Sequence, residues 1–308
     1  MSKLRISVIL WVAVFLVISS PLMAEKISLK ISYNSASIKK SDLNTWINSY
    51  NTFWKDWQAY SNGHLEGQFN TLNYGPKYEV ELRIPLFAGI AFNLSGSHFS
   101  NAEEGSISFD HGTLTQTEKD FIRNEIQGIP IKIGLSYSLA LPFSDKFFLF
   151  AGVGRHITLL KYKFIGDTEL KIGQSMIYSL KRDSSYNSEA LGFYATLGVE
   201  YDLIKPIAIV FEAEKVWSKA NGFKGPFLSD FFDPFENTRT VEEGKASLYF
   251  YEYKPWWNNT NYSSLTGYKT RPEDPEDFPV GIEQIQNIRQ GEFDLSTFSF
   301  KVGIRFKF

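Results

Sequence analysis

Residues 298–308 read Phe-Ser-Phe-Lys-Val-Gly-Ile-Arg-Phe-Lys-Phe, and this stretch alternates strictly between two kinds of side chain. Apolar residues fill every even position, and serine, lysine, glycine, arginine and lysine fill the odd positions. Successive side chains of a β-strand point to opposite faces, so the stretch predicts a strand with one aromatic and one polar face. In a soluble protein, both the aromatic face and the unpaired edge of this last strand would be exposed to water and prone to aggregation. A strand that turns this face to lipid and its polar face to a lumen avoids the problem, so we expect a transmembrane β-barrel.

The same stretch resembles the C-terminal insertion signal of bacterial outer-membrane barrels, in which a polar residue and a glycine precede two aromatic residues. Lys301, Gly303, Phe306 and Phe308 fill these positions. The resemblance implies that the chain is inserted into the outer membrane with the barrel-assembly machinery as a partner.

The composition agrees with a barrel and excludes several other classes of protein. The 308 residues include 27 Phe, 16 Tyr and 7 Trp, and the formal net charge is -2. Many aromatic residues without long apolar runs after the N-terminus are typical of membrane strands, where alternation disperses the apolar residues. The absence of cysteine excludes thiol catalysis and disulfides. The near-neutral charge without a basic cluster argues against a nucleic-acid partner.

The first 24 residues have the pattern of a secretory signal peptide. Lys3 and Arg5 give the positive start, residues 6–18 the apolar segment, and residues 20–24 the cleavage region. The alternative is an N-terminal membrane anchor, for which the apolar run is short. We therefore expect residues 25–308 to be exported through the periplasm to the outer membrane.

The rest of the chain predicts an all-β fold of eight antiparallel strands. They are expected at residues 27–35, 78–86, 90–97, 126–141, 147–164, 191–203, 207–217 and 298–308. Long connections alternate with short ones, which is the up-and-down pattern of a transmembrane barrel with long extracellular loops and short periplasmic turns. The long loops are expected at about 36–77, 101–125, 165–188 and 218–291.

Two points in this strand pattern are irregular. The outward face of residues 147–164 stays open, because apolar residues occur on both faces. Pro130 lies inside an expected strand although proline donates no ladder hydrogen bond, so we expect a bulge near the outer rim. A soluble barrel is the alternative fold, but its apolar residues would point inward.

Together, the signal peptide, the amphipathic strands, the Gly128-Ile129-Pro130-Ile131 segment and the aromatic last strand resemble the small eight-stranded outer-membrane β-barrel family. This family includes the membrane domain of OmpA and the OmpW-like proteins. The resemblance implies contact with outer-membrane lipid and lipopolysaccharide, and it implies no cofactor. It does not identify a function, because one scaffold carries many roles.

Charged residues fall on the expected inward face of several strands. They are Glu79, Glu81, Arg83, Lys132, Glu200, Asp202, Glu212, Glu214, Lys301 and Arg305. An eight-stranded barrel has room only for its own side chains, and buried charges have to be paired. We therefore expect a lumen plugged by ion pairs rather than an open pore, with Glu212 and Glu214 pairing with Arg83, Lys132 or Arg305. The last strand should also supply positive charge to these two carboxylates through Lys301 and Arg305.

The first long loop predicts a helix of about five turns. Ser41 is a candidate N-cap, the helix is expected to end near Asn62, and an aromatic face recurs at helical spacing. That face contains Trp46, Tyr50, Trp54 and Trp57. Two interpretations stay open: the helix contacts the membrane interface or a ligand, or its aromatic face packs on other loops and the barrel rim.

Aromatic residues also gather in the last long loop, among them Trp256 and Trp257. They predict an ordered cap over the barrel mouth, with a short strand at about residues 245–254. The acidic side chains of residues 273–277 do not match a calcium-loop spacing, so we expect a solvated turn and no metal site.

The expected function is non-enzymatic: a structural or surface-interaction role in which the loops contact an external ligand. The first alternative is an OmpW-like conduit for small hydrophobic molecules. The second is a lipid A-modifying enzyme, because His98 and Ser100 resemble the His-x-Ser pair of the barrel deacylases. That pair stands early in this chain rather than near its C-terminus, so we expect no catalytic residue.

Overall fold

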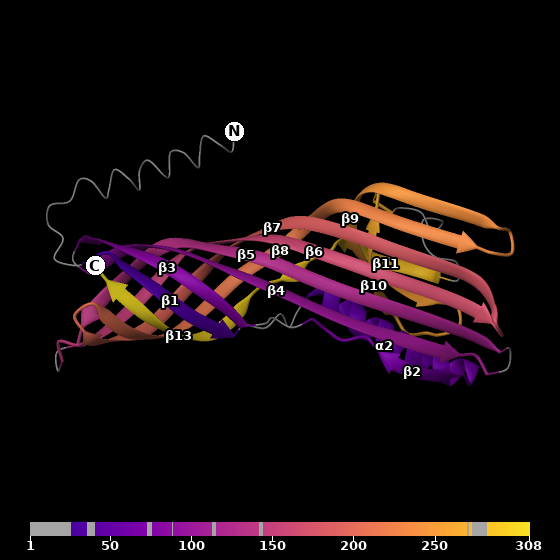
Figure 1. The fold of residues 1–308 in the computed structure, drawn as a ribbon, viewed down its shortest axis with the longest axis horizontal. Helices are drawn as coiled ribbons and strands as arrows, with labels where there is room; N and C mark the ends of the chain where they lie inside the picture. Colours follow the sequence, from indigo (N-terminus) through magenta and orange to yellow (C-terminus); the bar gives the residue numbers. More distant parts are fainter. Residues whose placement is uncertain are drawn as a thin grey trace.

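The computed structural model describes residues 26–35, 41–72, 76–87, 89–112, 115–141, 144–269, 271–272 and 282–308. These residues form one antiparallel sheet of 13 strands and one helix (Figure 1). The elements are β1 (Ser28–Ser35), α2 (Asp42–Ser61), β2 (His64–Gln68), β3 (Pro76–Phe87), β4 (Ile90–Asp110), β5 (Gln116–Ala140), β6 (Phe147–Ile172), β7 (Ser175–Ile204), β8 (Ile207–Asp233), β9 (Thr238–Pro255), β10 (Tyr262–Tyr268), β11 (Ile282–Gln290), β12 (Phe293–Asp294) and β13 (Thr297–Lys307). The expected all-β class is confirmed. The expected signal peptide (1–24) and the acidic turn (273–277) lie outside the described residues.

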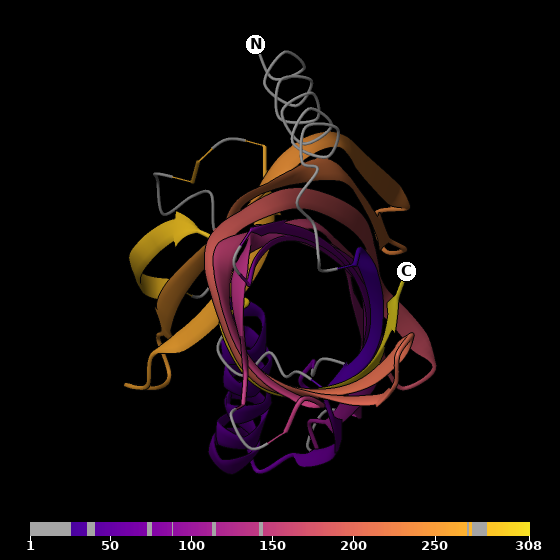
Figure 2. The same ribbon diagram turned by 90° about the vertical axis from the view of Figure 1, so that its left-hand side faces the viewer.

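The strand pairings close on themselves. β1 pairs with β3, the order continues through β4, β5, β6, β7 and β8, and β8 pairs with β13, which returns to β1. The end-on view shows this ring (Figure 2). The remaining strands pair with other strands but are not part of the closed path, with β2 on β4, β9 on β8, β10 and β11 on β9, and β12 on β8. The ring is irregular because its strands range from 8 residues in β1 to 30 in β7.

Two of the expected long loops are wrong. Residues 101–125 and 165–188 are mostly strand, because β4 to β7 continue far beyond the level at which β1, β3 and β13 end (Figure 1). The expected loop 218–291 likewise contains the end of β8 and the strands β9, β10 and β11. The long strands therefore build a tall wall on one side of the ring.

The outward and inward faces of these long strands exchange their character along the strand. We call the part of the ring that contains β1, β3 and β13 (left in Figure 1) the lower half, and the part where β4 to β9 project beyond them beside α2 (right in Figure 1) the upper half. In the lower half, Leu94 and Leu135 point outward and are 40% and 50% exposed. In the upper half, Phe109 on β4 and Ile122 on β5 are buried on the inward face. The β4–β5 register is the same at both ends of the pairing, so no slip causes the exchange. The apolar side faces out in the lower half and in toward a core in the upper half.

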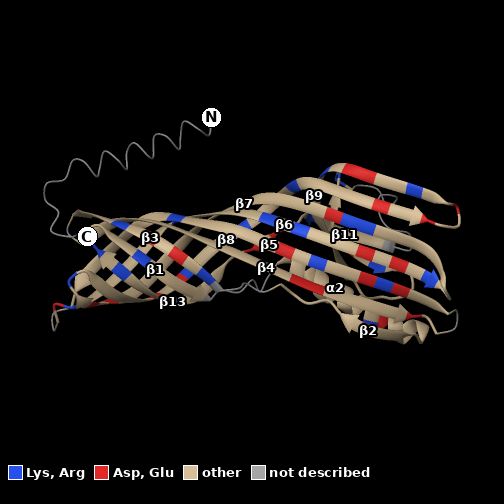
Figure 3. Ribbon diagram, viewed as in Figure 1, with Lys and Arg blue, Asp and Glu red and all other residues tan. Residues whose placement is uncertain are grey.

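The lower half therefore carries an outward apolar belt around the ring. It includes Ile31, Val80, Leu94, Leu135, Val153, Leu197, Phe211 and Val302, all between 40% and 63% exposed. The projecting parts of β5, β6, β7 and β9 instead display many charged residues (Figure 3). This division separates a part suited to an apolar surrounding from a part suited to water.

Helix α2 lies in the upper half, at the position expected from the sequence. The Ser41 hydroxyl accepts a hydrogen bond from the N–H of Asn44, and Asn62 ends the helix in the left-handed conformation at φ 54°. The Asp42 carboxylate accepts two hydrogen bonds from Arg289, so the helix start is tied to β11. Within the described residues, no helix has the combination of length and hydropathy that a membrane-crossing helix requires.

The structure resolves both irregular points of the strand pattern. Along β6 the even residues point inward, so Phe150 is buried while Leu149 and Val153 belong to the belt. Pro130 is buried in the middle of β5 rather than near its start, and no bulge accompanies it. Instead, the β4–β5 ladder lacks its pairs at this level while the register stays constant, which is how the missing N–H is accommodated.

Candidate functional site

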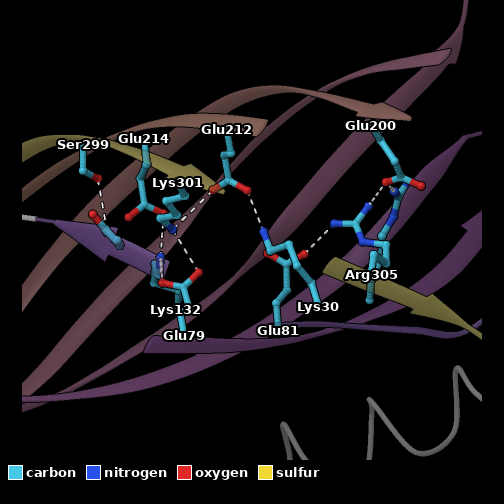
Figure 4. Close-up of polar contacts among 12 residues, drawn as sticks. Lys30, Glu79, Glu81, Lys132, Glu200, Glu212, Glu214, Ser299, Lys301 and Arg305 are labelled. Carbon is cyan, nitrogen blue, oxygen red and sulfur yellow. Dashed lines mark hydrogen bonds and ion pairs between the residues drawn. The ribbon is translucent and has the colours of Figure 1, made fainter. Parts of the chain in front are cut away.

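Buried charges fill the lower half of the ring (Figure 4). Lys301 Nζ lies 2.9 Å from Glu79 Oε1, 3.3 Å from Glu212 Oε1 and 2.6 Å from Glu214 Oε2. Lys132 Nζ lies 2.5 Å from both Glu79 Oε2 and Glu214 Oε2. Two ammonium groups thus contact three carboxylates, one from β3 and two from β8.

A second layer continues this network toward the C-terminal end. Lys30 Nζ lies 2.9 Å from Glu81 Oε2 and 2.5 Å from Glu212 Oε2, which joins the two layers. The Arg305 guanidinium donates to Glu81 and to Glu200. We call the central part of this network the plug, and define it as Lys30, Glu79, Glu81, Lys132, Glu200, Glu212, Glu214, Lys301 and Arg305. Arg83 and Lys307 adjoin it through Glu200.

Each of the two β8 carboxylates contacts an expected base. Glu214 contacts Lys132 and Lys301, and Glu212 contacts Lys301, which stands directly opposite it across the β13–β8 pair. Arg305 was also expected here but pairs with Glu81 and Glu200, and Glu212 instead takes Lys30 as its second partner. Arg83, a further expected member, donates to Ser138 Oγ over 2.5 Å, and its Nη1 lies 4.0 Å from Glu200 Oε2, so it joins the network at Glu200. Sequence reasoning missed Lys30, although it lies on the polar face of its strand.

The lumen has almost no free space at the plug. The cavity lined by Glu81, Lys132, Glu212, Glu214 and Arg305 measures about 10 Å³. A buried water needs about 10–15 Å³, so the space is at most that of one water molecule. The side chains therefore close the ring at this level.

Above the plug, aromatic rings form a second closure, which we call the floor. The ring of Tyr162 stacks on that of Tyr186 with centroids 6.1 Å apart, and it meets the ring of Phe293 edge-on with centroids 5.4 Å apart. The ring centroids of Phe293 and Phe223 lie 4.4 Å apart. All four are buried. Tyr162 donates to Asn124 Oδ1 over 2.7 Å, so its hydroxyl is satisfied. In the β5–β6 pair, the plug residue Lys132 stands opposite His156. Tyr162 lies six residues further along β6, toward the upper half. The floor therefore lies between the plug and the upper half.

A large cavity, which we call the chamber, lies above the floor. Its volume is about 920 Å³, toward the upper end of the range of small-molecule sites, about 300–1,000 Å³. Helix α2 supplies one side, the extended strands β5 to β8 another, and β9 and β10 a third. The aromatic residues that line it are Trp46, Tyr50, Phe53, Trp54, Trp57, Tyr162, Phe164, Tyr186, Phe227, Tyr251, Tyr253, Trp256, Trp257 and Tyr268.

The aromatic residues singled out from the sequence thus meet at the chamber. Trp46 and Trp54 are buried on the inner face of α2, whereas Trp256 is 59% exposed. Trp57 of α2 contacts Trp257, which follows β9, with ring centroids 5.0 Å apart. The aromatic face of α2 packs on other parts of the upper half, as one of the two interpretations expected, and the same residues line the chamber. Contact with the membrane interface or with a ligand stays a prediction.

Charged groups of contrasting kinds also line or adjoin the chamber. Burial and the neighbouring charge of Asp120 raise the pKa of Glu118 to about 8, so this carboxyl is neutral at pH 7. Tyr50 donates to Asp120 Oδ2 over 2.5 Å, and burial raises the pKa of both groups. On β7, burial together with the charges of Glu118 and Asp120 raises the pKa of Tyr178, while the charge of Arg182 acts on Asp120 and lowers its pKa.

The remaining candidate residues lie on the outer surface or in the closing strand. His98 and Ser100 are both exposed on β4, with buried Phe99 between them on the opposite face. In the insertion-signal stretch, Lys301 and Gly303 point inward, Phe306 points outward and pairs with Leu29 and Ile207, and Phe308 is exposed.

The fold and its interior define a closed antiparallel β-ring with a charged, filled lumen and a chambered upper half. No protein-family model matches the chain, and no curated protein sequence matches it significantly. Among solved structures, it superposes on the outer membrane protein OprG from Pseudomonas aeruginosa with a TM-score of 0.37 and 11% identity, over 92% of this chain and 96% of that one.

Two further solved structures are similar in the same loose way. A major outer membrane protein from Thermus thermophilus gives a TM-score of 0.29 at 11% identity, covering 93% of this chain and all of that one (100%). The outer membrane protease OmpT from Escherichia coli gives 0.21 at 10% identity, covering 92% and 94%. These TM-scores are too low to carry the family or the activity of any of these proteins over to this chain.

Proposed function

We propose that this chain is a bacterial outer-membrane protein whose ring forms an eight-stranded transmembrane barrel, plugged by ion pairs, with a non-enzymatic role at the cell surface. The observation that carries the proposal is that, at the same level of the ring, apolar side chains point outward in the belt and charged side chains fill the inside as the plug. A soluble barrel has the opposite arrangement, with apolar residues inside and polar residues outside. In this proposal the belt faces lipid, and the upper half with α2 and the chamber stands outside the cell.

Site-directed labelling tests the location and orientation, because the chain contains no cysteine of its own. Phe235→Cys places a thiol at the exposed upper turn, and Lys205→Cys places one in the short turn between β7 and β8. We expect a membrane-impermeant maleimide to label the Phe235 variant on intact cells and the Lys205 variant only after permeabilisation. Leu197→Cys in the belt should react only with a lipid-soluble reagent. Labelling of Leu197→Cys by the impermeant reagent in the folded protein would contradict the proposal.

Planar bilayer recordings test the plug. The refolded protein should give no single-channel current, because both the plug and the floor close the ring. A general porin recorded in parallel shows that the bilayer and the insertion protocol work. Steady ohmic steps from the pure protein, absent from a heat-denatured sample, would refute a plugged lumen.

The second candidate is a conduit for small hydrophobic molecules, and the volume and aromatic lining of the chamber favour it. Such a conduit requires the floor and the plug to open during passage. It predicts currents or uptake that change when Trp256 or Trp257 is replaced by alanine. Silent recordings together with unchanged uptake would count against it.

The non-enzymatic part of the proposal has its own test at His98 and Ser100. Both side chains are exposed on the outward face of β4. Overexpression of the wild type should leave the lipid A profile by mass spectrometry unchanged. A profile that changes with the wild type and not with His98→Ala would establish the enzymatic alternative.

A further inference from the structure

Arg182 on β7 is a half-buried arginine without a hydrogen bond or ion pair to any residue that the structure describes. It lines the chamber, and its Nε is buried without a partner. It lies over the ring of Phe164, with the guanidinium carbon 5.5 Å from the ring centroid. A guanidinium that gives up water for a protein interior normally finds an oxygen acceptor. A ligand that brings such an acceptor into the chamber would meet this guanidinium.

The strand register keeps space open beside Arg182. Its neighbour on β6 is Gly166, and its neighbour on β8 is Ser229. A Cβ at Gly166 would lie 2.8 Å from the Phe164 ring, so the glycine makes room for this ring beside the guanidinium. Phe164 in turn meets Trp46 of α2 edge-on at 5.8 Å. The guanidinium thus rests on a packed aromatic base, and its neighbours across the strands are small.

The acidic groups near the chamber leave Arg182 without a counter-charge of its own. Of those that line the chamber, Glu118 is neutral at pH 7 and Glu242 is exposed to solvent. The charge of Arg182 lowers the pKa of Asp120, but this carboxylate accepts a hydrogen bond from Tyr50 and makes no ion pair with the arginine. No carboxylate among the described residues therefore pairs with Arg182.

Two other polar groups of the chamber favour an acceptor as well. The buried indole N–H of Trp54 has no hydrogen-bond partner in the described part of the chain. Lys269, an exposed second cation, lies 5.3 Å from the ring centroid of Phe227 at the chamber wall. A ligand that brings negative oxygen atoms would thus meet donors and positive charge.

We propose that the chamber binds a small organic acid, with its carboxylate on Arg182 and its aromatic or apolar body against the rings of α2, β9 and β10. The fork of an arginine matches the two oxygens of a carboxylate, and such charge-assisted pairs are the strong ones. This inference deepens the surface role proposed above and rests on it, because it names the class of ligand that the upper half holds.

Neutral and cationic ligands fit the chamber less well. A neutral hydrocarbon would cover Arg182 without accepting its hydrogen bonds, and a buried donor without an acceptor is costly. A cation would meet the like charges of Arg182 and Lys269. The acid satisfies the guanidinium and buries an apolar body in the same step.

The probe pair is 2-naphthoate and 2-naphthamide, which share one ring system and differ in charge. Both are titrated against the full-length protein refolded in detergent micelles, with the fluorescence of the chamber tryptophans as the signal at pH 6.5. We expect naphthoate to bind at least about tenfold more tightly than naphthamide, as a charge-assisted pair should. Arg182→Met should remove this preference, and Arg182→Lys should retain part of it, because lysine keeps the charge but loses the fork.

Lys181→Met is the matched control, since Lys181 is the next residue on the same strand and is exposed on the outer face. It should bind naphthoate like the wild type. Equal affinity for the two probes, or full naphthoate binding by Arg182→Met, would overturn the proposal. Each variant is first checked for wild-type circular dichroism and unfolding. If Arg182→Met does not fold, Arg182→Lys and the probe comparison on the wild type decide.

Failure of the ligand proposal can be distinguished from failure of the barrel proposal. Correct cysteine labelling together with no preference for naphthoate would refute the ligand class and leave the membrane barrel in place. Failure of the labelling test would refute the barrel whatever the probes do.

Discussion

Replacement of Lys301 by methionine should strongly destabilise the protein, because Lys301 lies at the centre of the plug. Its side chain is 1% exposed, and its Nζ contacts three carboxylates within 3.3 Å. Methionine keeps much of the apolar stem but removes the charge. The change therefore tests the electrostatic role of the residue more than its packing.

The magnitude follows from the charges that remain. Without Lys301, the carboxylates of Glu79 and Glu214 share Lys132, and Glu212 keeps Lys30, which also serves Glu81. One buried negative charge is left uncompensated. Removal of one partner from a buried ion pair costs about 3–5 kcal/mol, so we expect a loss of about that size in the free energy of unfolding.

The assay is reversible urea unfolding of the protein refolded into lipid vesicles, followed by tryptophan fluorescence. Lys219→Met is the control, because this side chain is 58% exposed and pairs with the 34% exposed Glu292, away from the plug. A partly exposed pair is worth about 1 kcal/mol or less. Equal losses in the two variants, or a loss below about 1 kcal/mol for Lys301→Met, would refute a dry, tightly paired plug.

Three further predictions follow. Gly134→Ala should cost about 1–3 kcal/mol in unfolding free energy, because its Cβ would lie 2.3 Å from the Val153 carbonyl oxygen, whereas Gly96→Ala, with open space around it, should be neutral. Asp42→Asn should weaken the pair with Arg289 and speed proteolysis or amide exchange of α2, and unchanged exchange would contradict this. Naphthoate affinity should fall as the pH rises through about 8, because Glu118 is neutral below that pH and repels an anion above it. Glu118→Gln should remove this pH dependence.

The lower half could be predicted from the sequence because each strand there has one kind of surrounding on each face. The expected strand at 298–308 appears as β13, and the alternation correctly places Lys301 inside and Phe300 outside. Lipid outside and charge inside give a period of two that needs no knowledge of the partner strand. The individual ion pairs were harder to predict, because they depend on registers that the alternation does not specify.

The upper half could not be predicted in the same way, because its strands face water outside and a core inside. On β4 the apolar side chains pass from Leu94 outside to Ile107 and Phe109 inside, and the exchange looks like a loss of pattern. A loss of pattern predicts a loop, which is why 101–125 was expected to be one. The chamber was also hidden, because Trp57 and Trp257 are distant in the chain and meet only in the fold.

The seam between β1 and β13 has a consequence for how the ring assembles. Lys30 and Lys301 lie on the two seam strands, and both reach the Glu212 carboxylate on β8. Before the seam forms, these charges are hydrated and carry no desolvation cost. If β13 were shifted by one residue, Lys301 would turn toward lipid and the phenylalanines of this strand would turn toward the carboxylates. The buried charges therefore favour one register, because closing the ring in any other register would bury charges without partners.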